Sequence, residues 1–134
     1  METNNSSLIA TLKLYFTGII VANSPVWVFN TYRDIIINNF SITHLLLILC
    51  LSTLMGGALA GFLIARRTRQ GYHIAVGVTT GGFSYLFYTA LSVALKIVAV
   101  PYEDLVIIIG FVVGGSIGAM FWVMHIARVA KKLK

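Results

Sequence analysis

The sequence predicts an all-α integral membrane protein, a four-transmembrane-helix bundle with both termini in the cytoplasm. Three observations lead to this fold class. The chain of 134 residues is 58% hydrophobic and only 10% charged, whereas soluble domains are usually about 45–50% apolar and about 25% charged. Separate long apolar runs follow one another along the chain, and basic residues gather at alternate ends of them. This composition argues against a soluble enzyme, a disordered tail and a free nucleic-acid-binding domain.

The predicted spans follow from the lengths of the apolar runs, because a helix needs about 20 mostly apolar residues to cross the hydrocarbon core. We expect helices at about residues 8–29, 43–65, 73–96 and 104–127. The first lacks a basic leader and is long for a signal-peptide core, so we expect it to be retained. The connections are short, which predicts one membrane domain over residues 1–134.

Basic residues predict the orientation, because cytoplasmic loops are enriched in Lys and Arg. One basic cluster follows the second span, another follows the fourth, and two crossings between them bring both to the same side. The clusters consist of Arg66, Arg67, Arg69, Arg128, Lys131, Lys132 and Lys134. Lys13 can extend to that side as well, whereas Arg33 and Lys96 fall on the other.

The net charge of +6 is therefore interpreted as an orientation signal that also attracts anionic lipid. We predict membrane lipids as partners, together with other integral membrane subunits or further copies of the chain, and we predict no nucleic acid. The expected location is the cell membrane, crossed several times.

Small residues predict how the helices pack, since lipid supplies no hydrophobic drive for helix association and close backbone approach takes its place. Glycines recur at four-residue spacing, as in a glycine zipper. The predicted packing residues are Gly57, Gly61, Gly77, Gly81, Gly110, Gly114 and Gly118. The second and fourth spans each carry two adjacent rows of small residues, so we expect each to contact at least two other helices.

The third span carries a polar face. Its members, at three- and four-residue steps, are Tyr85, Tyr88, Ser92 and Lys96. A buried hydroxyl in lipid needs a hydrogen-bond partner, so this face predicts either hydrogen bonds between helices or the lining of a narrow polar path. At its outer end we expect Lys96 to meet Glu103 or Asp104.

Signs of chemistry within the predicted spans are few. Ionisable residues deep in a membrane mark ion and proton pathways, and the interiors of the predicted spans contain no Asp, Glu or Arg. The three histidines and Cys50 form no ligand motif. We therefore expect no catalytic residues, no metal, no cofactor and no enzymatic activity.

From the second predicted span onward, and over roughly half of its length, the chain resembles a group of uncharacterised small four-helix, glycine-rich integral membrane proteins of archaea and some Gram-positive bacteria. The stretches that carry the resemblance are MGGALAGFLIARRTRQGYHIAVGVTTGGF and IIGFVVGGSIGAM. The resemblance implies a four-helix membrane fold with a basic turn and a basic tail. It implies no assigned activity.

Two functions are compatible with these features. The favoured one is an accessory, structural membrane subunit that packs through glycine-rich helix faces into a larger membrane protein complex. The alternative is a small homo-oligomeric channel, or a lipid or solute transporter, with the polar face of the third span at the subunit junction. The mass of the gently extracted protein distinguishes them.

Overall fold

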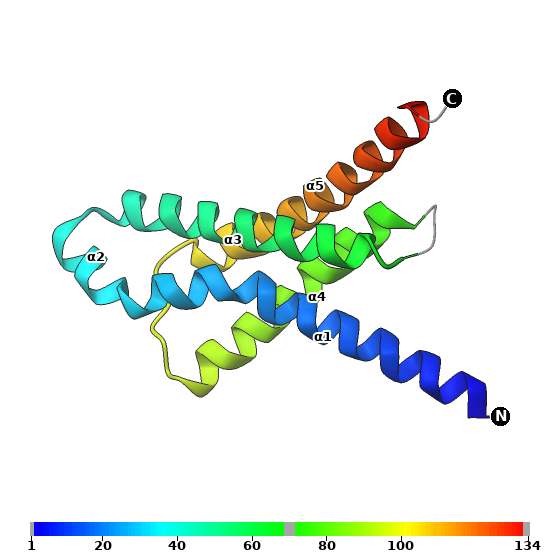
Figure 1. Cartoon of the computed structure of the whole chain (residues 1–134). Helices are drawn as coiled ribbons and strands as arrows, with labels where there is room; N and C mark the ends of the chain where they lie inside the picture. Colours follow the sequence, from blue (N-terminus) through cyan, green and yellow to red (C-terminus); the bar gives the residue numbers. More distant parts are fainter. Residues whose placement is uncertain (1, 69–71, 133–134) are drawn as a thin grey trace.

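The computed structural model describes residues 2–68 and 72–132, and the side chains of residues 9–68 and 72–131. The described residues form helices joined by short connections, with no strand among them (Figure 1). The helices are α1 (Glu2–Thr31), α2 (Arg33–Asn39), α3 (Ile42–Ala65), α4 (His73–Ala94) and α5 (Glu103–Lys132). Four of them, α1, α3, α4 and α5, are long and apolar enough to cross a membrane. The predicted all-α four-helix membrane bundle is thus confirmed.

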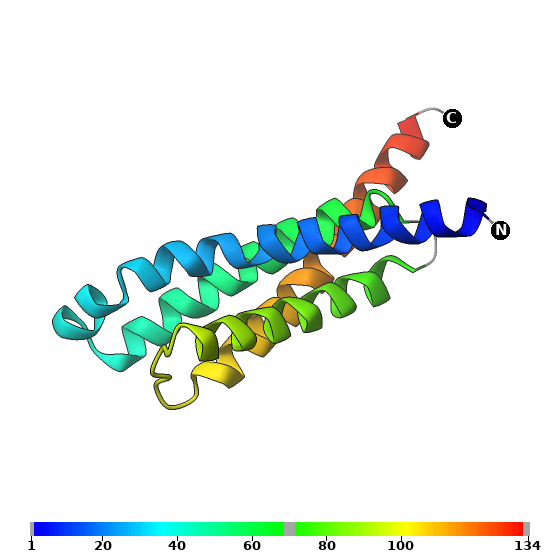
Figure 2. The same ribbon diagram turned by 90° about the horizontal axis from the view of Figure 1, so that it is seen from below.

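Helix α3 lies in the middle of the bundle. It contacts α1, α4 and α5, and α5 packs on both α3 and α4. Helices α3 and α5, the second and fourth spans, thus each have the two or more neighbours that their rows of small residues predict. Figures 1 and 2 show two unlike ends. The α2 end holds α2 and the connection from α4 to α5. The terminal end holds the first residues of α1 and the last residues of α5.

The structure departs from the predicted boundaries in four main places. Helix α1 begins at Glu2, before the predicted residue 8. The connection expected to be irregular contains the short helix α2, in which the Asn39 side chain donates to the carbonyl of Ile35 at 2.7 Å. Helix α4 ends at Ala94, before the predicted residue 96. Helix α5 continues to Lys132, beyond residue 127, because the sequence that follows contains neither Gly nor Pro to end it. Of the predicted basic residues, Arg69, Lys134 and the Lys132 side chain lie outside the described part.

The apolar core is concentrated in the middle of the bundle and toward the α2 end. Its buried members come from all four spanning helices: Ala22, Val26, Phe29, Leu45, Leu49, Ala60, Tyr88, Ile107 and Phe111. The first buried residue of α1 among those described is Gly18, and the last of α5 is Ala119. Beyond these residues α1 and α5 diverge toward the terminal end (Figure 1), which leaves grooves between the helices there.

All seven glycines predicted to pack lie at contacts between helices. A methyl group on Gly61 of α3 or on Gly77 of α4 would overlap the same carbonyl oxygen, that of Gly115 in α5. One turn away, Gly57 and Gly81 approach the Phe111 carbonyl in the same manner. The backbone of α5 therefore lies directly against α3 and α4, which is the close approach that small residues allow in lipid.

The remaining predicted glycines form the other row of α5. Gly110, Gly114 and Gly118 face α3, and added methyl groups there would overlap Thr53, Leu54 and Ala58, respectively. These contacts lie within the chain. The glycine rows therefore pack the chain on itself, and the expectation that glycine-rich faces serve a partner subunit stays a prediction.

A matched pair of substitutions tests this close packing. We expect Gly61→Ala to destabilise the bundle by about 1–3 kcal/mol, because the neighbouring backbone of α5 has to move. Gly82 has open space around it, so Gly82→Ala is expected to be neutral or stabilising by up to about 1 kcal/mol through helix propensity. The measurement is the free energy of unfolding in an SDS titration of mixed micelles. Equal effects of the two substitutions would contradict the packing described.

Candidate functional site

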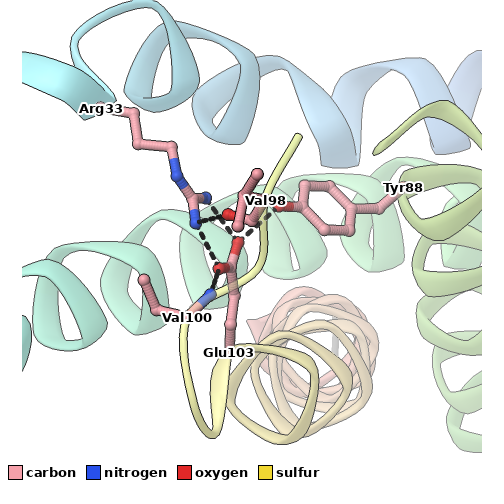
Figure 3. Close-up of polar contacts among 5 residues, drawn as sticks. All are labelled: Arg33, Tyr88, Val98, Val100 and Glu103. Carbon is pink, nitrogen blue, oxygen red and sulfur yellow. Dashed lines mark hydrogen bonds and ion pairs between the residues drawn. The ribbon is translucent and has the colours of Figure 1, made fainter. Parts of the chain in front are cut away.

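Two charged residues are buried at the α2 end of the bundle. Arg33 is the first residue of α2 and Glu103 is the first residue of α5. Their exposed fractions are 6% and 2%, and that of Tyr88 on α4 is 4%. We name Arg33, Tyr88 and Glu103 the charge cluster. It draws one side chain from each of three helices to a single point (Figure 3).

The Glu103 carboxylate is the centre of the charge cluster. Arg33 donates from Nη1 to Oε1 and from Nη2 to Oε2, each at 2.6 Å. Oε1 also accepts from the Tyr88 hydroxyl at 2.9 Å, and Oε2 accepts from the Val100 backbone N–H at 2.8 Å. Each carboxylate oxygen thus accepts two hydrogen bonds. Paired parallel bonds of this kind between guanidinium and carboxylate are among the strongest in proteins.

The cluster also shapes the connection between α4 and α5. Arg33 Nη2 donates to the Val98 carbonyl at 2.7 Å (Figure 3). Together with the bond from the Val100 N–H to Glu103, this contact fixes the connection at two points. Lys96 and Tyr102 adopt φ values of 54° and 66°, which are costly for residues other than glycine. The bonds to Arg33 and Glu103 compensate for that strain.

The ion pair keeps both partners charged without exposing them. Hydrogen bonding to the Glu103 carboxylate raises the pKa of Arg33 above its ordinary value, against the opposing effect of burial. Breaking a buried pair leaves an uncompensated charge, which is strongly destabilising. The cluster therefore connects α2, α4 and α5 through one buried carboxylate.

The predicted polar face of α4 is only partly brought together. Tyr88 reaches Glu103, whereas Tyr85 is half-buried beside the core. The Ser92 hydroxyl is buried and has no hydrogen-bond partner among the described residues. Lys96 is exposed and lies beyond the end of α4. The expectation that Lys96 meets Glu103 or Asp104 is therefore wrong, and Arg33 occupies that role.

Other hydroxyls of α4 bond to their own helix. Thr80 donates to the Val76 carbonyl at 2.7 Å, Ser84 to the Thr80 carbonyl at 2.8 Å and Thr89 to the Tyr85 carbonyl at 3.0 Å. Bonds to the preceding turn satisfy these groups locally. They therefore do not present a continuous row of free donors and acceptors along the helix.

Sequence reasoning missed Arg33 as a member of the cluster and paired Glu103 with the wrong residue. Arg33 was counted only as a basic residue on the side opposite the basic clusters, and Glu103 was assigned to a connection. The available signal was their opposite charge in two connections at the same end of the bundle. Burial of both side chains was not readable from composition.

Possible metal ligands do not gather in the described part of the chain, which contains no group of three or more His, Cys, Asp or Glu side chains that could hold a metal ion. His125 stacks on Trp122 with ring centroids 5.7 Å apart. His73 is buried at the start of α4 and its Nδ1 has no hydrogen-bond partner among the described residues. The absence of a cofactor stays a prediction.

The charge cluster can be tested by removing one partner or both. We expect Glu103→Gln to lower the free energy of unfolding by about 3–5 kcal/mol, because Arg33 is left buried and unpaired. Arg33→Met combined with Glu103→Leu should cost less than Glu103→Gln alone. The exposed neighbouring acid provides the control, Asp104→Asn, for which at most about 1 kcal/mol is expected. The measurement is the free energy of unfolding in an SDS titration. A double variant that loses as much stability as Glu103→Gln, or more, would refute the pairing.

The tyrosine in the cluster provides a second comparison. Tyr88→Phe removes one hydrogen bond to a charged acceptor and should cost about 1.5–3 kcal/mol. Tyr85→Phe, one turn away on the same helix, should cost less than about 0.5 kcal/mol if its hydroxyl has no such role. Thermal unfolding in detergent checks both. A polar-path role for Tyr88 would instead appear as an altered transport rate at unchanged stability.

Comparisons of the chain with protein-family models, with curated proteins and with solved structures returned no match. The resemblance to small glycine-rich membrane proteins stays a prediction, and the function has to be argued from the geometry of the molecule.

Proposed function

We propose that the chain is an accessory, structural subunit of a larger integral membrane protein complex and has no enzymatic activity of its own. The observation that carries this proposal is a groove between α1 and α4 with an unpaired polar atom beside it. The groove has a volume of about 290 Å³ and is lined by Ile20, Asn23, Ser24, Trp27 and Phe87.

Asn23 is the polar residue of interest in this groove. Its Nδ2 donates to the Ile19 carbonyl at 2.9 Å and to the Ser84 carbonyl at 3.3 Å. Its Oδ1 is buried and accepts no hydrogen bond from the described residues. An unpaired amide oxygen within a span is costly in hydrocarbon. Asn23 itself is 1% exposed, so the groups that a helix of another subunit can contact directly are the exposed side chains beside it.

The surroundings of the groove suit a helix of a partner. Ser24 and Trp27 are exposed on α1 beside Asn23, and hydroxyl and amide side chains hydrogen-bond across helices in membranes. The glycine rows make contacts within the chain, so we propose the α1/α4 groove as a surface that docks a partner. The alternative of a channel or transporter has less support, because the hydroxyls of Thr80, Ser84 and Thr89 on α4 are bonded within their own helix.

We propose further that the terminal end faces the cytoplasm and that the protein crosses the cell membrane. The basic residues described at this end are Lys13, Arg66, Arg67, Arg128 and Lys131, and the described acids Asp34, Glu103 and Asp104 lie at the α2 end. Arg33 belongs to the α2 end, but its charge is paired with Glu103. Among the described residues, Lys96 is then the one Lys or Arg at the α2 end without a carboxylate partner. The unpaired positive charge is therefore concentrated at the terminal end, which favours placing that end in the cytoplasm.

Labelling of single cysteines checks the orientation. In a Cys50→Ala background, Val98→Cys at the α2 end should react with a membrane-impermeant maleimide in intact cells. Tyr72→Cys, before α4, should react only after the cells are permeabilised. Both positions are well exposed, at 83% and 69%. The reverse pattern would contradict the cytoplasmic placement of the terminal end.

Photo-crosslinking tests the subunit proposal. A photoreactive amino acid replaces Trp27 in the groove or, as a control, Met55 on α3, which is 62% exposed. We expect the Trp27 variant to form a specific adduct with one larger membrane protein that co-purifies at native mass, and the Met55 variant to form none. A product of twice the chain mass supports the homo-oligomeric alternative instead. Adducts with lipid alone at both positions would contradict the proposal.

A further inference from the structure

A second groove lies at the terminal end, where α1 diverges from α3. Its volume is about 530 Å³. The lining residues are Ala10, Lys13, Leu14, Thr17, Gly18, Leu63, Ile64, Arg66 and Arg67. They divide into an apolar part along the helices and a part that carries three positive charges. The groove is distinct from the charge cluster and from the α1/α4 groove, which share none of its lining residues.

The three basic residues of this groove are available to a ligand. Lys13, Arg66 and Arg67 are exposed, and none of them forms a salt bridge with a carboxylate in the described part of the chain. Arg66 lies with its guanidinium carbon 5.9 Å from the centroid of the Trp122 ring, a contact that orients the side chain but leaves its charge uncompensated. The acids whose side chains the structure describes, Asp34, Glu103 and Asp104, lie at the opposite end of the bundle.

The rest of the groove is suited to hydrocarbon. Ala10, Leu14 and Leu63 supply apolar side chains, and the buried Ile64 side chain closes the floor by filling the space at Gly18. The Thr17 hydroxyl donates to the Lys13 carbonyl at 2.8 Å, so it is satisfied within its own helix. A small soluble anion would gain nothing from these apolar walls, whereas an amphiphile would use both parts.

We propose that this groove between α1 and α3 is a binding site for an anionic phospholipid. The phosphate headgroup contacts Lys13, Arg66 and Arg67, and an acyl chain lies along Ala10, Leu14 and Leu63. Guanidinium groups bind phosphate oxygens in pairs, and the lysine extends from its helix toward the headgroup layer. Basic pockets between transmembrane helices bind acidic lipid headgroups in this manner.

Native mass spectrometry of the full chain in non-ionic detergent tests the site. The probes are phosphatidylglycerol and phosphatidylcholine with identical acyl chains. We expect Lys13→Gln combined with Arg67→Gln to weaken phosphatidylglycerol binding by about tenfold or more. The control, Arg128→Gln combined with Lys131→Gln, removes the same charge outside the groove and should weaken binding by less than about threefold. Equal losses, or equal binding of the two lipids to the wild type, would overturn the proposal.

Two further experiments distinguish binding in the groove from attraction by net charge. Ala10→Trp fills the groove at unchanged net charge and should lower phosphatidylglycerol binding, whereas Ile9→Trp on the exposed face of α1 should not. Circular dichroism and gel filtration verify that each variant is folded. Inorganic phosphate should fail to displace the lipid at equal concentration. Displacement by phosphate, or full binding by the folded Ala10→Trp variant, would refute a lipid site.

Discussion

The ion pair between Arg33 and Glu103 joins the two halves of the molecule. Arg33 follows α1 in the first helical hairpin, and Glu103 begins α5 in the second, at a separation of 70 residues. Lipid offers the two hairpins no hydrophobic reason to associate. Close backbone contacts of α5 with α3 and α4 bring them together in the middle, and the charge cluster fixes them at the α2 end, where Tyr88 and the α4–α5 connection join the same carboxylate.

The opposite end of the bundle has no such connection among the described residues. There α1 and α5 diverge (Figure 1), and the basic side chains described along them form no ion pair with a described carboxylate. Like charges favour separation of the helices, and the grooves that result are apolar inside and positive at the mouth. The distribution of charge thus accounts for both the fixed end and the open end. It also places the proposed lipid site where a headgroup would supply the missing negative charge.

The sequence predicted the features that depend on local patterns. Hydropathy located the four spanning helices because it needs only about 20 consecutive residues, and four-residue spacing placed glycines such as Gly61 and Gly77 on contact faces because one turn separates them. The partner of Glu103 depended on the folded chain. Lys96 is close to Glu103 in sequence, but α4 ends before it, and Glu103 pairs instead with Arg33 at the start of α2. The unpaired oxygen of Asn23 likewise depends on which helices surround it.

The central claim is that the charge cluster holds the two hairpins together at the α2 end. Double electron–electron resonance in lipid nanodiscs measures the distance between the two hairpins directly. The spin labels are placed at Ile35 of α2 and Leu105 of α5 in a Cys50→Ala background. Both positions are 58% exposed, so labels are tolerated there. The account predicts one narrow distance distribution in the wild type and a broad one when Glu103 is replaced by Gln. A narrow distribution that the substitution leaves unchanged would contradict it.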